Sequence, residues 1–503
     1  MLLPMLNELP RDRELISTFG GYNHKLRIGD GEFYDMENLS SDHYPVLSVR
    51  KKRGSITNQT ERILGMIAKD RLFYVTKNFN NETATLYSMN ENGEHYIKLG
   101  EQNLTITVGD LNTERKKLIS MGAYVIVMPD KKWIKTIPDT LTDMTTGKVG
   151  YYYDQGVIDE APDLDLIIES QNRLWGCRYG LNQDNEFVNE IYASKQGDFN
   201  TWDSFEGNAQ DSYTATLGSE GKFTGAINYR GLPIFFKENC IHTVYGSYPA
   251  NYQIETLVCE GVQDECEDSV AIINGVVYYK ARSGIFAYDG SMPVKISDQL
   301  GDISKYLRAS AGVLGDKYYI SMADPETLQT VAEDGNAIVY DDPVAFMERV
   351  VFVYDTKNRI WYKETSFSSP VTETEIFCNF KGNLYFAPVG KSMRTVIGTS
   401  KNEDAVKWYA ETGIIGVDDP DKKYVSRLDI KMSLEIGAKA RFYIQYDSSG
   451  EWEYLFTMTG TSLRSFSIPI RPKRCDHFRL KLEGEGDMKL FSLCKNVERG
   501  SNV

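Results

Sequence analysis

The 503-residue sequence has little that would support long helices, a membrane span or a secretory signal. Long segments with apolar residues at i, i+3, i+4 and i+7 are missing, so little helix is expected. No uninterrupted apolar run approaches the roughly 18 residues that a membrane span requires. The segment 1–15 is interrupted by Pro4 and by charges from Glu8 onward, so it lacks the apolar core of a signal peptide.

Cysteine and histidine are few and dispersed. The seven cysteines are odd in number and form no Cys-x-x-Cys motif, which predicts free, mostly buried thiols in a protein that folds in the cytoplasm. Cys259 and Cys266 could pair or bind a metal, but no histidine lies near them in sequence. The five histidines form no His-x-x-x-His motif, so no zinc site is expected. His242 follows Ile241 in a strand pattern and is expected to be a hydrogen-bonded core residue. No cofactor is predicted.

Positive charge is also scarce. The 56 Lys and Arg residues are outnumbered by 71 Asp and Glu residues, which gives a net charge of −15. This balance argues against a sequence-specific or general nucleic-acid-binding protein, because phosphate contacts need clustered Lys and Arg. It does not exclude a surface past which DNA slides, since like charge prevents the two from adhering.

What the sequence does contain is aromatic residues, glycine and short apolar runs. Aromatic residues make up 12% of the chain, and 41 glycines separate the runs, which is typical of an all-β protein with many turns. In Ala271–Gly290, the pair Asn274-Gly275 between two apolar runs predicts a type I′ hairpin, and Ile285–Tyr288 predicts a third strand. A meander of this size is unstable alone, so it needs neighbours of the same kind.

The same hairpin unit recurs seven times, each as a turn pair followed by an aromatic or aliphatic run. The turn pairs are Lys69-Asp70, Met121-Gly122, Gln171-Asn172, Arg230-Gly231, Asn274-Gly275, Gly315-Asp316 and Lys381-Gly382. Their spacing of 41 to 66 residues scatters around the length of a four-stranded propeller blade. The pattern therefore predicts a six- or seven-bladed β-propeller over residues 55–395. The alternative is a large β-sandwich whose hairpins are merely alike.

Residues 1–54 are predicted to form an extended N-terminal arm that packs on the propeller. The arm has few apolar runs but several aromatic residues, and it ends in the densest basic cluster of the chain, Arg50–Arg53. We expect a strand around Val46–Val49 to pair with an exposed blade edge. The basic cluster would then face an acidic surface of the same chain or of a ring neighbour, or would be solvated. The candidate assembly contacts are Tyr22, Tyr34, Tyr44, Arg50, Lys51, Lys52 and Arg53.

The rest of the chain adds a loop and a second domain. Residues 323–348 are polar and acidic, which predicts a long excursion from a blade. Residues 396–503 contain strand-like runs separated by glycines, which predicts a C-terminal β-sandwich.

Three segments resemble known virion proteins. GGYNHKLRIGDGEFYDMENLSSDHYPVLSVRKKRG resembles the start of structural proteins from morphogenesis clusters of tailed phages and prophages of Gram-positive gut bacteria. IYASKQGDFNTW, followed by LPIFFKENCIHTVYGSYPANYQIE, resembles the propeller of tail-nozzle and packaged-DNA stabilisation proteins of short-tailed phages. SIPIRPKRCDHFRLKLEG resembles the closing segment of the same proteins.

The resemblance implies a phage virion structural protein at the head–tail junction or in the tail, assembled in the host bacterial cytoplasm. Its implied partners are portal, adaptor or tail proteins and other copies of itself in a ring, through which genomic DNA passes. No Gly-x-Ser-x-Gly motif, Walker loop or EF-hand loop occurs, so the chain is not expected to be an enzyme.

Two alternatives stay open. Trp202, Tyr245 and Tyr248 could stack on sugars in a receptor- or glycan-binding tail protein. A carboxylate pair could instead serve a propeller glycoside hydrolase, although many of the acidic residues fall in turns.

Overall fold

The computed structural model describes residues 11–499 apart from several internal stretches, which are 56–61, 78–82, 90–94, 97–104, 108–114, 137–138, 143–148, 153, 183, 328–346, 367–375, 388–392, 399–402 and 419–420. In the described ranges the regular elements are β-strands and short 3₁₀ turns, which confirms the predicted all-β class. No helix in these ranges is long and apolar enough to cross a membrane. Most of the acidic excursion expected at 323–348 lies outside the described residues.

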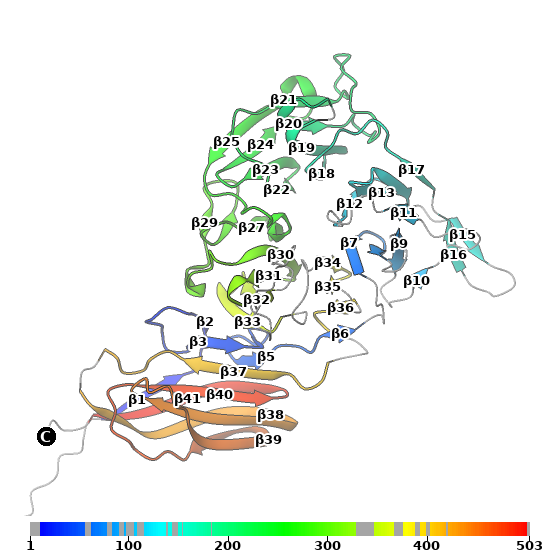
Figure 1. The fold of residues 1–503 in the computed structure, drawn as a ribbon. Helices are drawn as coiled ribbons and strands as arrows, with labels where there is room; N and C mark the ends of the chain where they lie inside the picture. The colour runs from blue at the N-terminus through cyan, green and yellow to red at the C-terminus, as the bar shows by residue number, and fades with distance from the viewer. Residues whose placement is uncertain are drawn as a thin grey trace, which may run out of the picture.

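Seven small antiparallel sheets are arranged in a ring, so the chain contains a seven-bladed β-propeller (Figure 1). Blade 1 consists of β7 (Arg62–Ala68), β8 (Leu72–Lys77), β9 (Thr83–Met89), β10 (His95–Tyr96) and β11 (Thr105–Thr107). Blade 2 consists of β12 (Lys117–Met121), β13 (Tyr124–Met128), β14 (Lys132–Lys135) and β17 (Gln155–Val157). Blade 3 consists of β18 (Leu166–Ser170), β19 (Arg173–Leu181), β20 (Phe187–Ala193) and β21 (Tyr213–Thr216). A separate hairpin, β15 (Asp139–Thr142) and β16 (Val149–Tyr152), precedes β17.

The remaining four blades complete the ring. Blade 4 consists of β22 (Gly225–Tyr229), β23 (Leu232–Lys237), β24 (Cys240–Tyr245) and β25 (Gln253–Val258), and blade 5 of β26 (Ala271–Ile273), β27 (Val276–Lys280), β28 (Ile285–Tyr288) and β29 (Val294–Lys295). Blade 6 consists of β30 (Leu307–Leu314), β31 (Lys317–Asp324), β32 (Glu348–Asp355) and β33 (Ile360–Glu364). Blade 7, the last, consists of β34 (Ile376–Phe380), β35 (Asn383–Ala387), β36 (Arg394–Thr395) and β6 (Gly54–Ser55). The 3₁₀ turns are η1 (Pro249–Asn251), η2 (Glu267–Ser269), η3 (Asp298–Leu300) and η4 (Pro325–Thr327).

Six of the seven predicted turn pairs lie between the first and second strand of one blade. The seventh is wrong by one residue, because Met121 ends β12 and the turn consists of Gly122 and Ala123. At Asn274 and Gly275 both φ angles are positive, 51° and 76°, as a type I′ turn requires. The turns also link neighbouring blades, because the Tyr229 hydroxyl donates to the Gly275 carbonyl at 2.7 Å. The turn residues therefore shape the hairpins and fasten them to one another.

The ring closes with strands from both ends of the propeller sequence. The innermost strand of the last blade, β34, contacts β30 on one side and β7 on the other. The outermost strand of that blade is β6, which comes from the N-terminal region and pairs Ser55 with Arg394 and Gly54 with Thr395. The last blade is thus completed by residues that precede the first blade in sequence.

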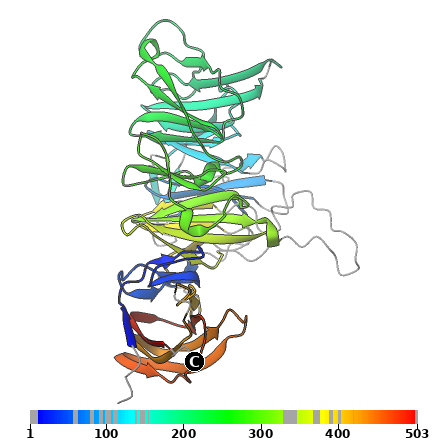
Figure 2. The ribbon, with the colours of Figure 1, turned by 90° about the vertical axis from the view of Figure 1, so that its left-hand side faces the viewer.

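The C-terminal region and residues 11–49 together form a ten-stranded sheet below the propeller (Figure 2). Its strands are β1 (Arg11–Ile16), β2 (Gly21–Tyr22), β3 (Glu32–Glu37), β4 (Leu39–Ser40), β5 (Leu47–Val49), β37 (Lys407–Thr412), β38 (Lys423–Tyr446), β39 (Glu453–Ile468), β40 (Phe478–Glu485) and β41 (Met488–Arg499). The expected pairing of residues 46–49 with a blade edge is wrong, because β5 pairs with β41 and β4. The arm carries too little apolar surface to fold alone, and it buries that surface in the C-terminal sheet.

The ten-stranded sheet is bent into two facing halves that share one core. The first part of β38 pairs with β41 and its last part pairs with β40, while β39 follows β38 along its other side. The bend lies near Gly437, whose φ of 92° suits glycine. Alternate residues of β38 point into the core, including Ile430 and Phe442. The region is therefore a sandwich made from one curled sheet.

A substitution at Gly484 would test how tightly this sandwich is packed. A side chain at this position would collide with the Lys439 carbonyl oxygen and the Trp408 ring. We predict that Gly484→Ala destabilises the protein by about 1–3 kcal/mol, the usual cost of overpacking, and lowers the melting temperature measured by calorimetry. Gly218→Ala is the matched control, because no atom lies within 4 Å of the added carbon there. An equal effect of the two substitutions would contradict the packing described.

Candidate functional site at the junction of the propeller and the sheet

The chain passes between the propeller and the sheet at two neighbouring crossings. The first crossing, Arg50–Arg53, joins β5 of the sheet to β6 of the last blade. The second crossing joins β36 of the same blade to β37 of the sheet, and its described residues are 396–398 and 403–406. The two lie side by side, because the Gly398 amide donates to the Lys52 carbonyl at 2.8 Å and the Glu403 amide donates to the Arg53 carbonyl at 2.9 Å.

Buried ion pairs connect these crossings to blade 6. A guanidinium nitrogen of Arg53 lies 2.9 Å from Glu364 Oε2, at the end of β33, and Arg50 Nε lies 3.7 Å from the same oxygen. Arg50 also forms an ion pair with Glu403, and the Arg53 amide donates to Glu403 Oε1 at 2.9 Å. Arg50 and Arg53 are only 6% and 4% exposed. We call Arg50, Arg53, Glu364 and Glu403 the junction cluster.

The electrostatics of the junction cluster favour the ionised form of Glu403. Burial alone would raise the pKa of Glu403, but hydrogen bonds and charge from Arg50, with the amide and charge of Arg53, lower this pKa overall. Burial lowers the pKa of Arg53, Arg50 lowers it further, and Glu364 opposes both effects. Removing either carboxylate would break an ion pair of a buried arginine, which is far more costly than losing an exposed pair.

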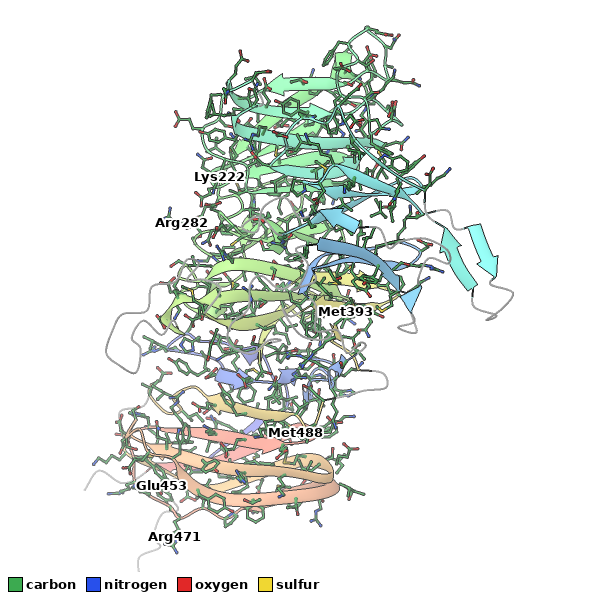
Figure 3. All side chains as sticks on the ribbon, turned by 45° about the vertical axis from the view of Figure 1, so that its right-hand side comes forward. Lys222, Arg282, Met393, Glu453, Arg471 and Met488 are labelled. Carbon is green, nitrogen blue, oxygen red and sulfur yellow. The ribbon has the colours of Figure 1, made fainter. Side chains whose placement is uncertain are left out.

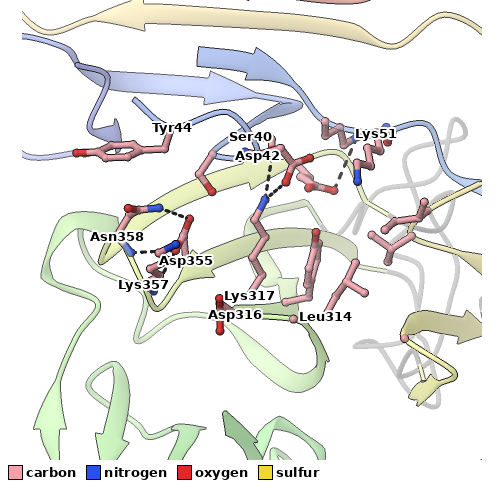
Figure 4. A pocket seen from close by; sticks show the side chains of 18 residues that line it. Ser40, Asp42, Tyr44, Lys51, Leu314, Asp316, Lys317, Asp355, Lys357 and Asn358 are labelled. Carbon is pink, nitrogen blue, oxygen red and sulfur yellow. Dashed lines mark hydrogen bonds and ion pairs between the residues drawn. The ribbon is translucent and has the colours of Figure 1, made fainter. Parts of the chain in front are cut away.

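A second ion pair lies beside the first crossing, at the edge of a cavity of about 600 Å³ (Figure 4). Lys317 Nζ, from the first hairpin of blade 6, lies 2.6 Å from Asp42 Oδ1 and 2.9 Å from Ser40 Oγ. Burial favours the protonated acid, but Lys317 lowers the pKa of Asp42 overall. Asp355 and Tyr44 also line this cavity. The pair joins the loop between β4 and β5 to the propeller.

A larger cavity of about 910 Å³ opens on the other side of the first crossing. Lys51 and Lys52 line it together with Lys489 and with residues at the bend of the sheet. Ile436, at the tip of that bend, is 98% exposed. This side of the junction therefore combines lysines with an exposed aliphatic side chain.

The predicted assembly residues do not lie on one surface. Tyr22 is buried against Phe352, with ring centroids 5.5 Å apart. Tyr34 stacks on His24 at 4.2 Å and lies under the guanidinium of Arg479. Of the three tyrosines, only Tyr44 is largely exposed.

The basic cluster divides in the same way. Lys51 and Lys52 are exposed, whereas Arg50 and Arg53 are buried. The expectation that the basic cluster faces acidic groups of its own chain is confirmed for the two arginines. A role of any of these residues in assembly stays a prediction.

Sequence reasoning missed the acidic half of the junction cluster. Glu364 ends a blade strand and Glu403 lies in a connecting segment, and neither stands in a motif. Each is more than 300 residues from the arginines that it contacts. No local pattern could have identified these pairs, because they form only once the propeller has returned the chain to its starting point.

The other residues considered from the sequence are placed as follows. His242 is buried, and its two ring nitrogens lie 2.9 Å from Ser219 Oγ and Thr256 Oγ1, as expected for a core histidine. Trp202 is buried and donates to the Phe199 carbonyl, whereas Tyr245 and Tyr248 are exposed. All seven cysteines are free. Among the described residues, no group of three or more His, Cys, Asp and Glu side chains is arranged to hold a metal ion.

The structures that resemble this chain do so at low sequence identity. No family model matches it, and no curated protein matches it. The extracellular domain of a hybrid two-component system from B. thetaiotaomicron is 11% identical, with a TM-score of 0.38, covering 89% of this chain and 63% of that one. A Trypanosoma rangeli sialidase in complex with 2,3-difluorosialic acid is 8% identical, with a TM-score of 0.29, covering 97% of this chain and 96% of that one.

The sialidase corrects one expectation. The sequence was expected to belong to a protein that is not an enzyme, because it lacks a catalytic motif. That expectation is contradicted, since one of the structures similar to this chain is an enzyme. A likeness of 8% identity and a TM-score of 0.29 does not assign a reaction to this chain.

The buried ion pairs generate a stability prediction. Glu364→Gln keeps the side-chain size but removes the carboxylate shared by Arg50 and Arg53. We expect a loss of about 3–5 kcal/mol, the usual cost of breaking a buried ion pair by removing one partner, seen as a lower melting temperature. Lys52→Gln, an exposed position on the same crossing, should change stability by less than about 0.5 kcal/mol. Similar melting temperatures for both variants would show that the junction cluster is not important for stability.

The same groups predict acid sensitivity. The pKa values of Asp42 and Glu403 are lowered in the folded protein, so their contribution is present above their unfolded values of about 4 and is lost as the pH falls further. Burial raises the pKa of Glu37, which opposes this trend on acidification. The melting-temperature difference between the unmodified chain and Glu403→Gln should therefore shrink from pH 7 to pH 3. A difference independent of pH would contradict this assignment.

Proposed function

We propose that the chain is a structural component of a tailed-bacteriophage particle, located at the head–tail junction or in the tail. Several copies would form a ring around the path of the genomic DNA, in contact with portal, adaptor or tail proteins. The ring would assemble in the cytoplasm of the host bacterium. The resemblance of the N-terminal arm, of segments 191–202 and 232–255 and of the closing segment to virion proteins supports this proposal.

The observation that carries the proposal is the fastening of the propeller to the sheet. Two crossings of the chain are held together by backbone hydrogen bonds and by the junction cluster. One continuous apolar core also runs from blades of the propeller into the sheet, through Tyr22 and Phe352 among others. A particle that holds packaged DNA under pressure needs parts that keep their shape, and a junction without a hinge suits that requirement.

The charge of the chain is compatible with a DNA path. A net charge of −15 disfavours tight phosphate binding, so DNA would pass without adhering. The residues that remain candidates for contacts between subunits are the exposed ones at the junction, Tyr44, Lys51 and Lys52. Arg50 and Arg53 would instead act within the chain, by fixing the orientation of the propeller.

Purified particles of the phage that encodes this sequence provide the test. We predict that mass spectrometry finds the chain in them in several copies, and that cryo-electron microscopy finds a propeller and sandwich of this shape in a ring on the tail axis. Absence of the chain from the particles would overturn the proposal. A peripheral position together with specific sugar binding would favour the receptor-binding alternative instead.

A further inference from the structure

The sheet has one long edge that no described strand covers. Strand β39 has 16 residues and pairs only with β38. It lies at the end of the molecule farthest from the propeller, where Glu453 and Arg471 are also found (Figures 1 and 3). Its outer side therefore presents a row of backbone N–H and C=O groups without a strand partner among the described residues.

This edge differs from the other edges of the sheet. The strands at the two ends of the sheet path, β2 and β4, have two residues each, and both contact β33 of the propeller. Strand β1 is short and carries alternating charges in the sequence RDRELI. By contrast, β39 contains no proline and no lysine, and only two of its 16 residues, Glu453 and Arg464, are charged, so it has little of the usual protection of an exposed edge.

Several apolar side chains of β39 are only partly buried against the core of the sheet. Met458 and Ile468 are buried, whereas Phe456 and Phe466 are only partly buried against the same core. Tyr454 and Leu463 are 58% and 47% exposed. Another strand beside β39 would cover these apolar groups and extend the sheet.

The segment from Tyr454 to Cys475, which contains most of β39 and the loop after it, is basic in an acidic protein, although Glu453 begins the strand. Between Tyr454 and Cys475 the sequence contains four basic residues and no acidic residue. The four are Arg464, Arg471, Lys473 and Arg474. Because the whole chain carries −15, the rest of it carries −19, which is −15 minus these four positive charges. Lys473 pairs with Glu453 at 2.8 Å, while Arg464 and Arg471 are exposed, and the Arg464 guanidinium lies 4.5 Å from the centroid of the Phe466 ring.

We propose that β39 is a docking site for an extended acidic segment of another protein, which adds to the sheet as a further strand. The backbone of that segment would bond to the free edge of β39, its apolar side chains would cover Phe456 and Phe466, and its carboxylates would face Arg464 and Arg471. This inference does not depend on the proposed function, because it follows from the edge itself.

Charge and shape favour this partner over two others. Self-pairing of β39 with a second copy would bring two basic segments together, which costs energy. Duplex DNA would meet the cations but could neither bond to a strand edge nor cover aromatic side chains. An extended peptide with alternating apolar and acidic residues satisfies all three features of the site.

A fluorescent peptide of alternating valine and glutamate is the probe, with binding to the full-length protein measured by fluorescence anisotropy. We expect binding that is lost when alternate peptide amides are N-methylated, because those amides can no longer bond to the edge. The double variant Arg464→Glu and Arg471→Glu should weaken binding by about tenfold. The matched control is Arg282→Glu combined with Lys222→Glu, which changes the charge equally at exposed propeller positions (Figure 3) and should leave binding unchanged.

Four results would overturn the proposal. The first is the absence of any peptide binding, and the second is equal binding of the N-methylated peptide. The third is tighter binding of a DNA duplex than of the peptide, which would assign the basic residues to nucleic acid. The fourth is self-association that the Arg464→Glu and Arg471→Glu variant abolishes in analytical ultracentrifugation, which would assign the edge to a second copy. Melting temperatures of both double variants would establish that each is folded.

Discussion

The buried contact of Arg50 and Arg53 with Glu364 and Glu403 is the constraint on which the arrangement of the two domains depends. The arginines lie on the first crossing, Glu403 lies on the second, and Glu364 ends the outermost strand of blade 6. The cluster therefore joins three segments that are far apart in sequence. Because each of the two arginines is almost fully buried, none of the charges can separate without a large cost in desolvation.

Both closed β-structures depend on the same short N-terminal stretch. Leu47–Val49 is a strand of the sheet, Arg50–Arg53 forms the crossing, and Gly54–Ser55 is the last strand of the last blade. The last blade lacks its outermost strand, and the sheet lacks β5, without residues from this stretch. The N-terminal region is therefore an integral part of both structures, and it gives the junction its geometry.

Local sequence signals predicted the repeated part of the fold. The turn pairs predicted six or seven blades because each one sets the backbone of its own hairpin, as the positive φ angles of Asn274 and Gly275 illustrate, and the structure has seven. The place of Leu47–Val49 in the sheet could not be predicted in this way. Its partner Leu490 lies more than 400 residues away, and a blade edge offers the same backbone groups as β41 does.

Only part of the candidate site could be predicted from the sequence, for the same reason. The cluster Arg50–Arg53 stood out by composition, but nothing in the sequence separates the two buried arginines from the two exposed lysines. That division follows from the direction of each side chain along the crossing, which the fold alone determines. Tyr22 was also predicted to contact another protein, but it packs on Phe352 of its own propeller.

The claim that the propeller and the sheet form one rigid unit is tested most directly by a distance measurement across the junction. Spin labels at the exposed positions Arg282 and Lys489, with the half-buried Cys259 and Cys378 replaced by serine, would report on the two domains by pulsed electron paramagnetic resonance. A rigid junction predicts one narrow distance distribution that broadens when Glu364 is replaced by glutamine. A broad distribution in the unmodified chain would contradict the account.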